Sequence, residues 1–206
     1  MRFSIDLPHF KTLLIAANVT FTAVFLAACS LVEDEQPPTP PMFQFGAAAP
    51  FVVSTQSIEI IEEFQPTYQP PNVEHEYTIP LVAVARAWGE KRLTARGDNG
   101  ALKFIIRDAS LIQKNLETTS SWRDAMVDEP NIRLDARLEI VIEYEGPIGD
   151  VVSRAVVAAK STSYESATVA EMDREYYEML EEMASELDSV LADQFDSELS
   201  QLLVAP

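Results

Sequence analysis

The sequence of 206 residues contains a single cysteine, Cys29, and only two histidines. With one thiol the chain cannot form an internal disulfide bond, so its fold must be stabilised by a hydrophobic core alone. Basic residues are also scarce, since 15 Lys and Arg stand against 33 Asp and Glu and give a net charge of −18. Because nucleic-acid phosphates and anionic lipid head groups attract Lys and Arg, this balance argues against binding to nucleic acid or to a charged lipid surface.

The sequence also lacks the short motifs that mark common catalytic centres. The nucleophile elbow of serine hydrolases, the zinc-protease helix motif, the Walker A loop and the Rossmann glycine pattern are all missing. Glu74-His75-Glu76 offers nitrogen and oxygen ligands to a metal ion, but neighbouring side chains in an extended segment point in different directions. We therefore predict a protein that is not an enzyme and has no catalytic, metal or cofactor site. A hydrolase that uses His75 is the alternative.

Residues 1–28 have the layout of a secretory signal. A weakly basic start with Arg2 and Lys11 precedes an uncharged stretch over residues 12–28 that finishes on small residues. This stretch is shorter than the roughly 20 apolar residues of a transmembrane helix, and polar residues interrupt it. The pattern favours a cleaved signal over a permanent membrane span.

The signal ends in Leu26-Ala27-Ala28-Cys29, which resembles the lipobox of bacterial lipoproteins. The resemblance implies cleavage after Ala28, a diacylglycerol on the Cys29 thiol and an acyl chain on its freed amine. Such chains anchor a protein durably to a membrane, at about 0.8 kcal/mol per buried methylene. The alternative is an unmodified Cys29, either at an ordinary signal-peptidase site or in an uncleaved membrane anchor. Ser30, in place of aspartate, implies the periplasm-facing side of the outer membrane rather than the inner membrane.

Composition divides the chain into three regions. A signal peptide over residues 1–28 is expected to precede a lipidated, proline-rich tether over residues 29–50 and a single domain over residues 51–206. Residues 33–50 contain five prolines and an acidic cluster. This composition is typical of an extended linker rather than of a helix or a strand.

Alternating hydrophobic residues predict four strands. The pattern is clearest over residues 131–145, where apolar side chains occupy one face and charged side chains the other, apart from Val141. Residues 51–64 predict the first strand, and a segment from Ala101 onward predicts the second, with a kink. Residues 151–164 follow a Gly-Pro turn and predict a fourth strand that forms a hairpin with the third.

Two amphipathic helices accompany these strands. The first is expected to begin at Thr78, a capping residue, and to have stopped by Gly97. The second opens with Thr168 and Glu171, which have the spacing of a capping box. Its apolar stripe extends as far as Leu203, with a bend expected near the end.

The resulting order, β-α-β-β-β-α, predicts an α+β fold of two layers. Two helices are expected to cover one face of a four-stranded, mainly antiparallel sheet and to leave its charged face open to water. This order behind a lipobox and tether resembles the LPS-assembly lipoprotein family and the auxiliary lipoproteins of lipid-transport ABC systems. Residues 88–110 also resemble a stretch of uncharacterised exported lipoproteins. The resemblance implies an accessory of an outer-membrane complex or, alternatively, a lipid-binding transport subunit.

Two features are candidate contacts with a protein partner in the envelope. Trp122 and Met126 lie on an otherwise polar connection over residues 117–130, and exposed aromatic side chains are frequent binding anchors. The alternative is that Trp122 packs back over the end of the sheet. The second candidate is the apolar segment 195–204, which needs a partner if the last helix outruns the sheet. The alternative is that this segment folds back onto the core.

Overall fold

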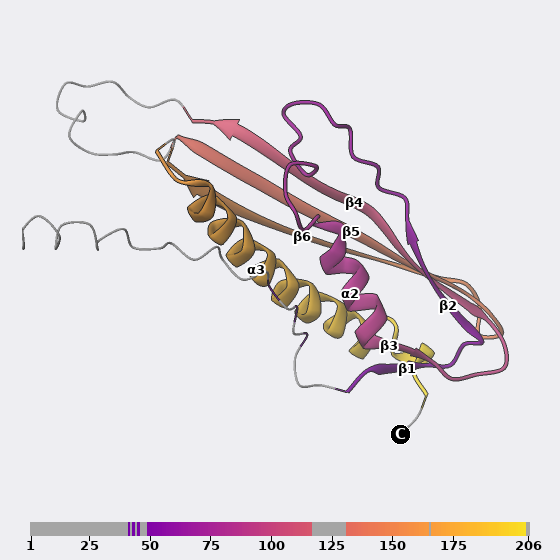
Figure 1. The fold of residues 1–206 in the computed structure, drawn as a ribbon. Helices are drawn as coiled ribbons and strands as arrows, with labels where there is room; N and C mark the ends of the chain where they lie inside the picture. The colour runs from indigo at the N-terminus through magenta and orange to yellow at the C-terminus, as the bar shows by residue number, and fades with distance from the viewer. Residues whose placement is uncertain are drawn as a thin grey trace, which may run out of the picture. The chain divides into compact units, whose positions relative to one another are not determined.

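The computed structural model describes residues 41, 43, 45, 49–116, 131–164 and 166–204. Its fold is of the predicted α+β class, and its main elements follow the predicted order (Figure 1). The elements in chain order are β1 (Phe51–Val53), β2 (Ser57–Glu62), α2 (Val82–Arg92), β3 (Leu93–Ala95), β4 (Ala101–Asn115), β5 (Ile132–Glu145), β6 (Val151–Ser163), α3 (Val169–Asp196) and the 3₁₀ helix η3 (Ser200–Leu202).

Four strands form one sheet in the order β2-β4-β5-β6. β2 pairs with β4 in parallel, whereas the other two pairings are antiparallel, so the sheet is mainly antiparallel as predicted. A parallel pair requires a crossover connection, and α2 lies in that connection. The predicted hairpin of β5 and β6 is confirmed. Its turn closes with a 3.0 Å hydrogen bond from the Gly149 N–H to the Gly146 carbonyl oxygen, and the φ of +101° at Gly149 favours glycine there.

The kink predicted in the second strand is present as an irregularity of β4. The pairing of β4 with β5 shifts register between Ile106 and Asp108, which is the behaviour of a β-bulge. On either side of this shift the strand keeps its alternation, so that Phe104 and Leu111 are both buried. β4 is therefore one long strand that pairs with β5 on both sides of the bulge.

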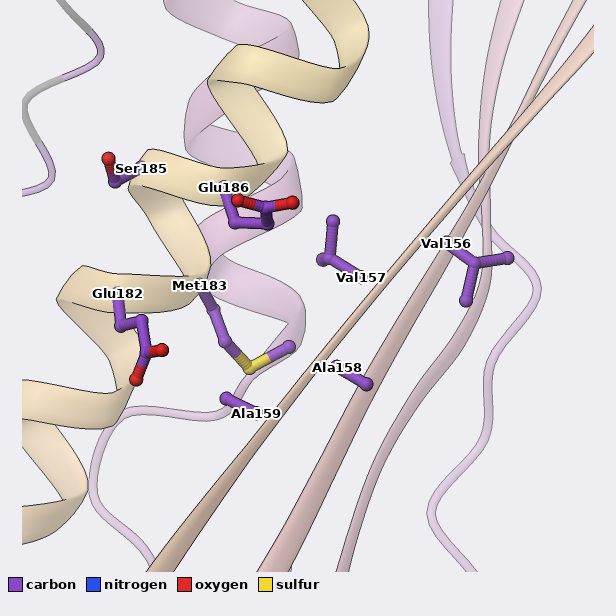
Figure 2. Close-up of a pocket in the computed structure, with 8 residues that line it drawn as sticks. All are labelled: Val156, Val157, Ala158, Ala159, Glu182, Met183, Ser185 and Glu186. Carbon is purple, nitrogen blue, oxygen red and sulfur yellow. The ribbon is translucent and has the colours of Figure 1, made fainter.

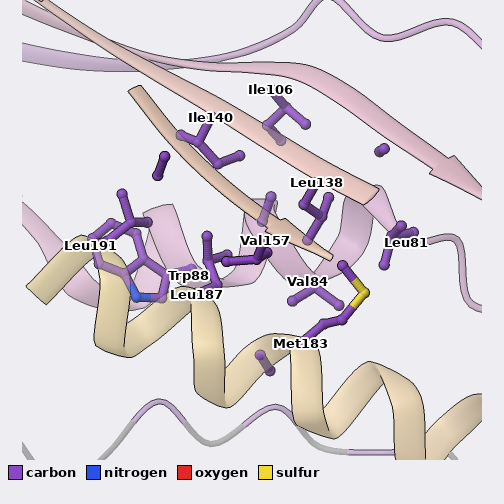
Figure 3. Close-up of a cluster of buried hydrophobic side chains, with 14 of the residues drawn as sticks. Leu81, Val84, Trp88, Ile106, Leu138, Ile140, Val157, Met183, Leu187 and Leu191 are labelled. Atoms are coloured by element: carbon purple, nitrogen blue, oxygen red, sulfur yellow. The ribbon is translucent and has the colours of Figure 1, made fainter. Parts of the chain in front are cut away.

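The hydrophobic core lies between the sheet and the two helices, which cover the same face (Figures 1 and 3). Leu138 and Ile140 of β5 meet Trp88 of α2 and Leu187 of α3 in one buried cluster. Burial of apolar surface stabilises a fold by about 25 cal/mol per Å², so this layer is the main source of stability. The two-layer arrangement is as predicted.

The prediction of one strand over residues 51–64 is wrong, because two strands in different sheets occupy this segment. β1 pairs in parallel with β3 in a separate two-stranded sheet, and β2 joins the main sheet. Between them the chain bends, and the buried Thr55 donates a hydrogen bond of 3.1 Å from Oγ1 to the Ser57 carbonyl oxygen. Neither the short apolar run of β1 nor the alternation in β2 reveals the bend between them.

The predicted limits of the first helix are also wrong. α2 begins at Val82 rather than near Thr78, because Pro80 disfavours helical backbone in the residue before it. No side chain caps this end of the helix. The helix ends at Arg92, before Gly97, since the chain passes directly into β3.

The capping box of the second helix is confirmed. Thr168 Oγ1 accepts a 3.2 Å hydrogen bond from the Glu171 N–H, and Glu171 Oε2 accepts a 2.7 Å hydrogen bond from the Thr168 N–H. The hydrogen bonds that Thr168 donates to this carboxylate, from its N–H and from Oγ1 at 3.1 Å, hold the pKa of the Glu171 carboxyl below its ordinary value of 4.5. The local sequence therefore determines where α3 begins.

The apolar segment at the end of α3 folds back onto the core, as the alternative prediction had it. α3 ends at Asp196, and Leu199 and Leu202 beyond it are fully buried. Leu203 forms an antiparallel bridge with Val53 of β1. These residues pack within the fold and do not form an exposed contact surface.

Part of the segment predicted as a tether contacts α2. The Phe45 side chain is buried in the core, and Phe43 is packed against it. Lys91 donates a 2.8 Å hydrogen bond from Nζ to the carbonyl oxygen of Phe43. The chain is thus held to the helix layer ahead of β1.

A polar link connects α2 and α3 at one side of the core. Asp188 of α3 accepts hydrogen bonds through Oδ1 from Trp88 Nε1 at 2.8 Å and from Arg92 Nε at 2.9 Å. Arg92 is 3% exposed, donates from Nη1 to the Ala49 carbonyl oxygen at 2.7 Å, and lies 4.8 Å from the centre of the Phe51 ring. One carboxylate therefore fixes both helices and the chain that leads into β1.

Replacing Asp188 with alanine should lower the free energy of unfolding by roughly 3 kcal/mol, because a buried arginine loses its carboxylate partner. Denaturant unfolding followed by circular dichroism measures the change. Glu181→Ala, at an exposed position of the same helix, is the matched control and should stay within about 0.5 kcal/mol of the wild type. Equal stability of the two variants would contradict a structural role for the link.

Candidate functional site

Most of the residues predicted to carry function lie outside the described part of the chain. These are the lipidation site Cys29, the cleavage site Ala28, and the contact candidates Trp122 and Met126. They remain predictions. Within the described residues, no helix has both the length and the hydrophobicity of a transmembrane span.

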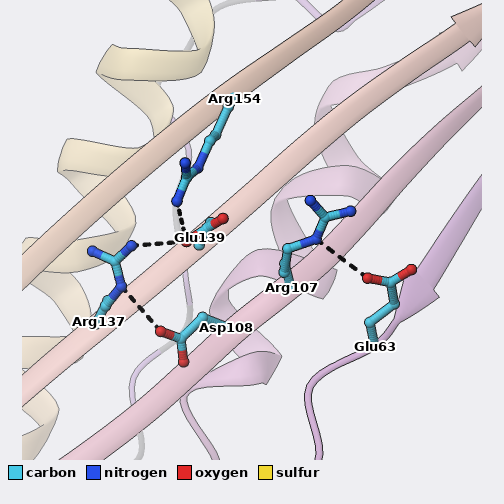
Figure 4. Close-up of polar contacts among 6 residues, drawn as sticks. All are labelled: Glu63, Arg107, Asp108, Arg137, Glu139 and Arg154. Atoms are coloured by element: carbon cyan, nitrogen blue, oxygen red, sulfur yellow. Dashed lines mark hydrogen bonds and ion pairs between the residues drawn. The ribbon is translucent and has the colours of Figure 1, made fainter.

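The sheet face that the helices leave uncovered carries a row of ion pairs across three strands (Figure 4). Arg137 of β5 lies 3.0 Å through Nε from Asp108 Oδ2 and 2.7 Å through Nη2 from Glu139 Oε2. Arg154 Nη2 of β6 lies 2.7 Å from the same glutamate oxygen. Glu139 is only 7% exposed, since both arginine side chains contact it.

These cations change the titration of the carboxylates on this face. Hydrogen bonds from Arg154 and from Arg137 hold the pKa of Glu139 below its ordinary value of 4.5, against the opposite effect of burial. The hydrogen bond from Lys114 and the charge of Arg133 likewise hold the pKa of Asp135 below 3.8. The charges that the sequence places on a water-facing surface are thus paired with one another.

An apolar pair also lies on this open face. Ile105 and Val141 stand directly opposite each other in the pairing of β4 with β5, and both are buried. Val141 is the residue that breaks the charged pattern of the third predicted strand. Its neighbour across the strands explains the break, since directly opposed apolar side chains stabilise a sheet.

Acidification should destabilise the protein through Glu139. A depressed pKa in the folded state stabilises the fold above about 4.5, and this contribution is lost as the pH falls through the lower, folded-state value. Glu139→Gln should therefore unfold at a lower temperature than the wild type at neutral pH, and the difference should shrink in acid. Thermal unfolding of both proteins, measured from neutral pH into acid, tests this prediction. Glu143→Gln, on the same strand and face, is the control. A difference that stays constant with pH would contradict the assignment.

The outer edge of β6 faces a groove beside α3 (Figure 2). β6 is an edge strand because only β5 pairs with it in the sheet. The groove has a volume of about 370 Å³ and is lined by residues 156–159 of β6 and by Glu182, Met183, Ser185 and Glu186 of α3. Successive residues of a strand point to opposite faces, so a lining that includes four consecutive residues follows the edge of the strand.

Only one end of this edge is covered, by the last turn of α3 and the residues that follow it. Gln194 Nε2 donates to the Arg154 carbonyl oxygen at 2.9 Å, and Ser153 Oγ donates to Glu198 Oε2 at 3.1 Å. In the part of the chain that the structure describes, no hydrogen bond from α3 reaches residues 156–159. On the open face Val152 is 69% exposed and Val156 is 40% exposed. The edge therefore offers backbone hydrogen-bonding groups next to apolar side chains.

A second hollow, of about 370 Å³, lies where the segment before α2 crosses the sheet. Its lining includes Phe64, Tyr68, Glu74, His75, Tyr77 and Leu81. His75 Nε2 is 4.0 Å from Glu76 Oε1, but no group of three potential metal ligands lies together within the described ranges. Sequence reasoning missed this hollow because its residues lie in a proline-broken segment without periodicity. No local signal identifies it.

Comparison with known proteins gives similarity of fold only. No family model matches the sequence, and no curated protein matches it. Among solved structures, rare lipoprotein B from Shewanella oneidensis is similar with a TM-score of 0.39 and 13% identity, covering 71% of this chain and 98% of that chain. A minor lipoprotein from Acinetobacter baumannii is similar with a TM-score of 0.37 and 11% identity, covering 75% of this chain and 99% of that chain. Similarity at this level identifies neither a family nor a function for this chain.

Proposed function

We propose that this chain is a lipid-anchored protein of the bacterial outer membrane, on its periplasmic side, that works by binding a partner protein. Lipidation at Cys29 holds the folded part near the membrane through the proline-rich segment. The partner contact is made along the β6 edge. The observation that carries this proposal is the uncovered edge of β6 beside Glu182 and Glu186 of α3, which together form an acidic wall.

An uncovered strand edge supports binding by strand addition. In this mode an extended segment of the partner pairs with the edge, so that backbone hydrogen bonds supply affinity and side-chain contacts supply specificity. The backbone groups of residues 156–159 that point away from β5 provide the pairing, and Val152 and Val156 provide apolar contacts on the open face. The contacts of Arg154 with Gln194 and of Ser153 with Glu198 limit where the added segment can lie.

The charge around the groove determines which kind of partner segment can bind there. Glu182 and Glu186 are one turn apart on α3, and both are exposed where they line the groove. A partner segment with Lys or Arg at alternate positions neutralises them, whereas an acidic segment is repelled. A second copy of this chain is disfavoured on the same ground, because the net charge is −18. The occupant is therefore an extended basic segment of another protein.

Lipidation is tested by labelling cells that express the full chain with radioactive palmitate. We expect the wild type to incorporate the label and Cys29→Ser to remain unlabelled. Ser30→Ala, next to the lipidation site, should keep both the label and the outer-membrane location, and Ser30→Asp should keep the label but move to the inner-membrane fraction. Equal labelling of Cys29→Ser would contradict the anchor.

The β6 edge is tested with two synthetic peptides that alternate Val with either Lys or Glu. The Lys peptide should bind the wild-type protein and protect from hydrogen exchange those amides of residues 156–159 that point away from β5. Glu182→Lys combined with Glu186→Lys should weaken this binding at least about tenfold, because the acidic wall becomes basic.

A matched variant controls for net charge. Glu178→Lys combined with Glu181→Lys makes the same change at exposed positions of α3 outside the groove, and should leave the affinity within about twofold. Equal binding of the Lys and Glu peptides, or self-association through β6 measured by sedimentation, would refute the proposed occupant.

A further inference from the structure

The hollow beside α2 contains a buried carboxylate with an unused oxygen. Glu74 is 3% exposed. Its Oε1 accepts a long hydrogen bond of 3.4 Å from the Thr67 N–H, and within the described residues its Oε2 is buried and accepts none. A buried acceptor without a donor costs free energy that a bound donor would recover. The carboxylate therefore indicates a ligand that supplies a hydrogen-bond donor.

The walls around Glu74 are aromatic. Phe64, Tyr68, His75 and Tyr77 all line the hollow, and the rings of Tyr68 and His75 are 5.2 Å apart. Tyr68 has a φ of 55°, in the left-handed region that residues other than glycine rarely adopt. Backbone outliers of this kind gather at binding sites. Aromatic faces attract cations, so the walls favour a positively charged donor.

The surrounding charge is negative. Burial, followed by the charges of Glu76, Asp173 and Glu175, raises the pKa of Tyr77 to about 12. Glu62 also lines the hollow, where it is paired with Arg86. The three carboxylates in this set, as distinct from burial, favour a cation next to Glu74.

The fold sets this geometry in place without a ligand. The segment is fastened to β4 by hydrogen bonds from the Val73 N–H to the Leu111 carbonyl oxygen and from the Gln113 N–H to the Pro71 carbonyl oxygen, both 2.9 Å. Tyr77 packs against Tyr176 of α3 with the rings tilted by 31° and their centres 4.0 Å apart. A site formed in advance loses little conformational entropy on binding.

We infer that this hollow binds an organic ammonium ion, with Glu74 Oε2 accepting from the ammonium group and the aromatic walls surrounding its apolar body. The volume of about 370 Å³ is near the lower end of ligand pockets and suits one small amine or one ammonium head group. The site is separate from the β6 groove, so this inference does not depend on the proposed partner contact.

The test uses the full chain and phenethylamine as probe, with binding measured by calorimetry and amide chemical shifts. The wild type should bind the amine and show shifts at Tyr68, Glu74 and Tyr77. It should bind 2-phenylethanol, the neutral analogue, at least about tenfold more weakly, because the hydroxyl can still donate a hydrogen bond but carries no positive charge.

Three variants separate binding from folding. Glu74→Gln keeps the size of the side chain and should weaken amine binding at least about tenfold, and Tyr68→Leu, at a 67% exposed position, should weaken it without unfolding the protein. Glu181→Gln, which removes one negative charge at an exposed position of α3 that does not line the hollow, should leave binding unchanged. No binding by the folded wild type, equal binding of amine and alcohol, or full affinity in Glu74→Gln would overturn the inference.

A competition experiment identifies the source of the ammonium group. Dihexanoyl phosphatidylethanolamine and dihexanoyl phosphatidylglycerol differ in the ammonium group and are both soluble. Displacement of phenethylamine by the ethanolamine lipid alone assigns the site to a lipid head group. No displacement by either lipid assigns it to a free amine. Displacement by both lipids would show binding through the acyl chains and would refute ammonium recognition.

Discussion

The fold depends on a single carboxylate that holds two buried donors of a neighbouring helix. Asp188 accepts from Trp88 and from Arg92, and through Arg92 it also reaches the chain ahead of β1. Hydrophobic packing alone has no direction and does not decide how two helices lie on a sheet. The buried Arg92 does fix how the helices lie, because other placements would separate its charge from Asp188. The position of α2, and with it the hollow formed by the preceding segment, follows from this requirement.

The sheet presents two surfaces of different character to solvent. Across the open face, carboxylates and guanidinium groups neutralise one another in pairs, with Ile105 and Val141 buried among them. Such a face has few unsatisfied groups to offer a partner. Along the β6 edge the situation is reversed, since the strand has no neighbour and the adjacent helix presents an acidic wall. Proteins with a long free edge normally protect it, and Lys160 and the contacts that Gln194 and Glu198 make with Arg154 and Ser153 do so only in part.

Local sequence predicted the elements whose causes are local. The alternation in β5, the Gly-Pro turn and the Thr168–Glu171 capping box each depend on residues close in the chain, and each is confirmed. The bend between β1 and β2 was not predictable, because it depends on the pairing of β1 with β3, which lies about forty residues later in the chain. The burial of Glu74 has the same origin, since its segment is fastened to β4 by contacts across a similar distance. Neither the hollow nor the β6 groove could be predicted from periodicity, which describes one element at a time.

The return of the last described residues to the first strand has a consequence for how the protein folds. Leu203 bridges Val53, the Ser54 N–H donates to the Leu202 carbonyl oxygen at 2.7 Å, and the Val204 N–H donates to the Val52 carbonyl oxygen at 2.9 Å. The contacts of β1 are therefore completed by residues about 150 positions further along the chain. Contacts between residues so far apart slow folding, because a long loop must close before they can form.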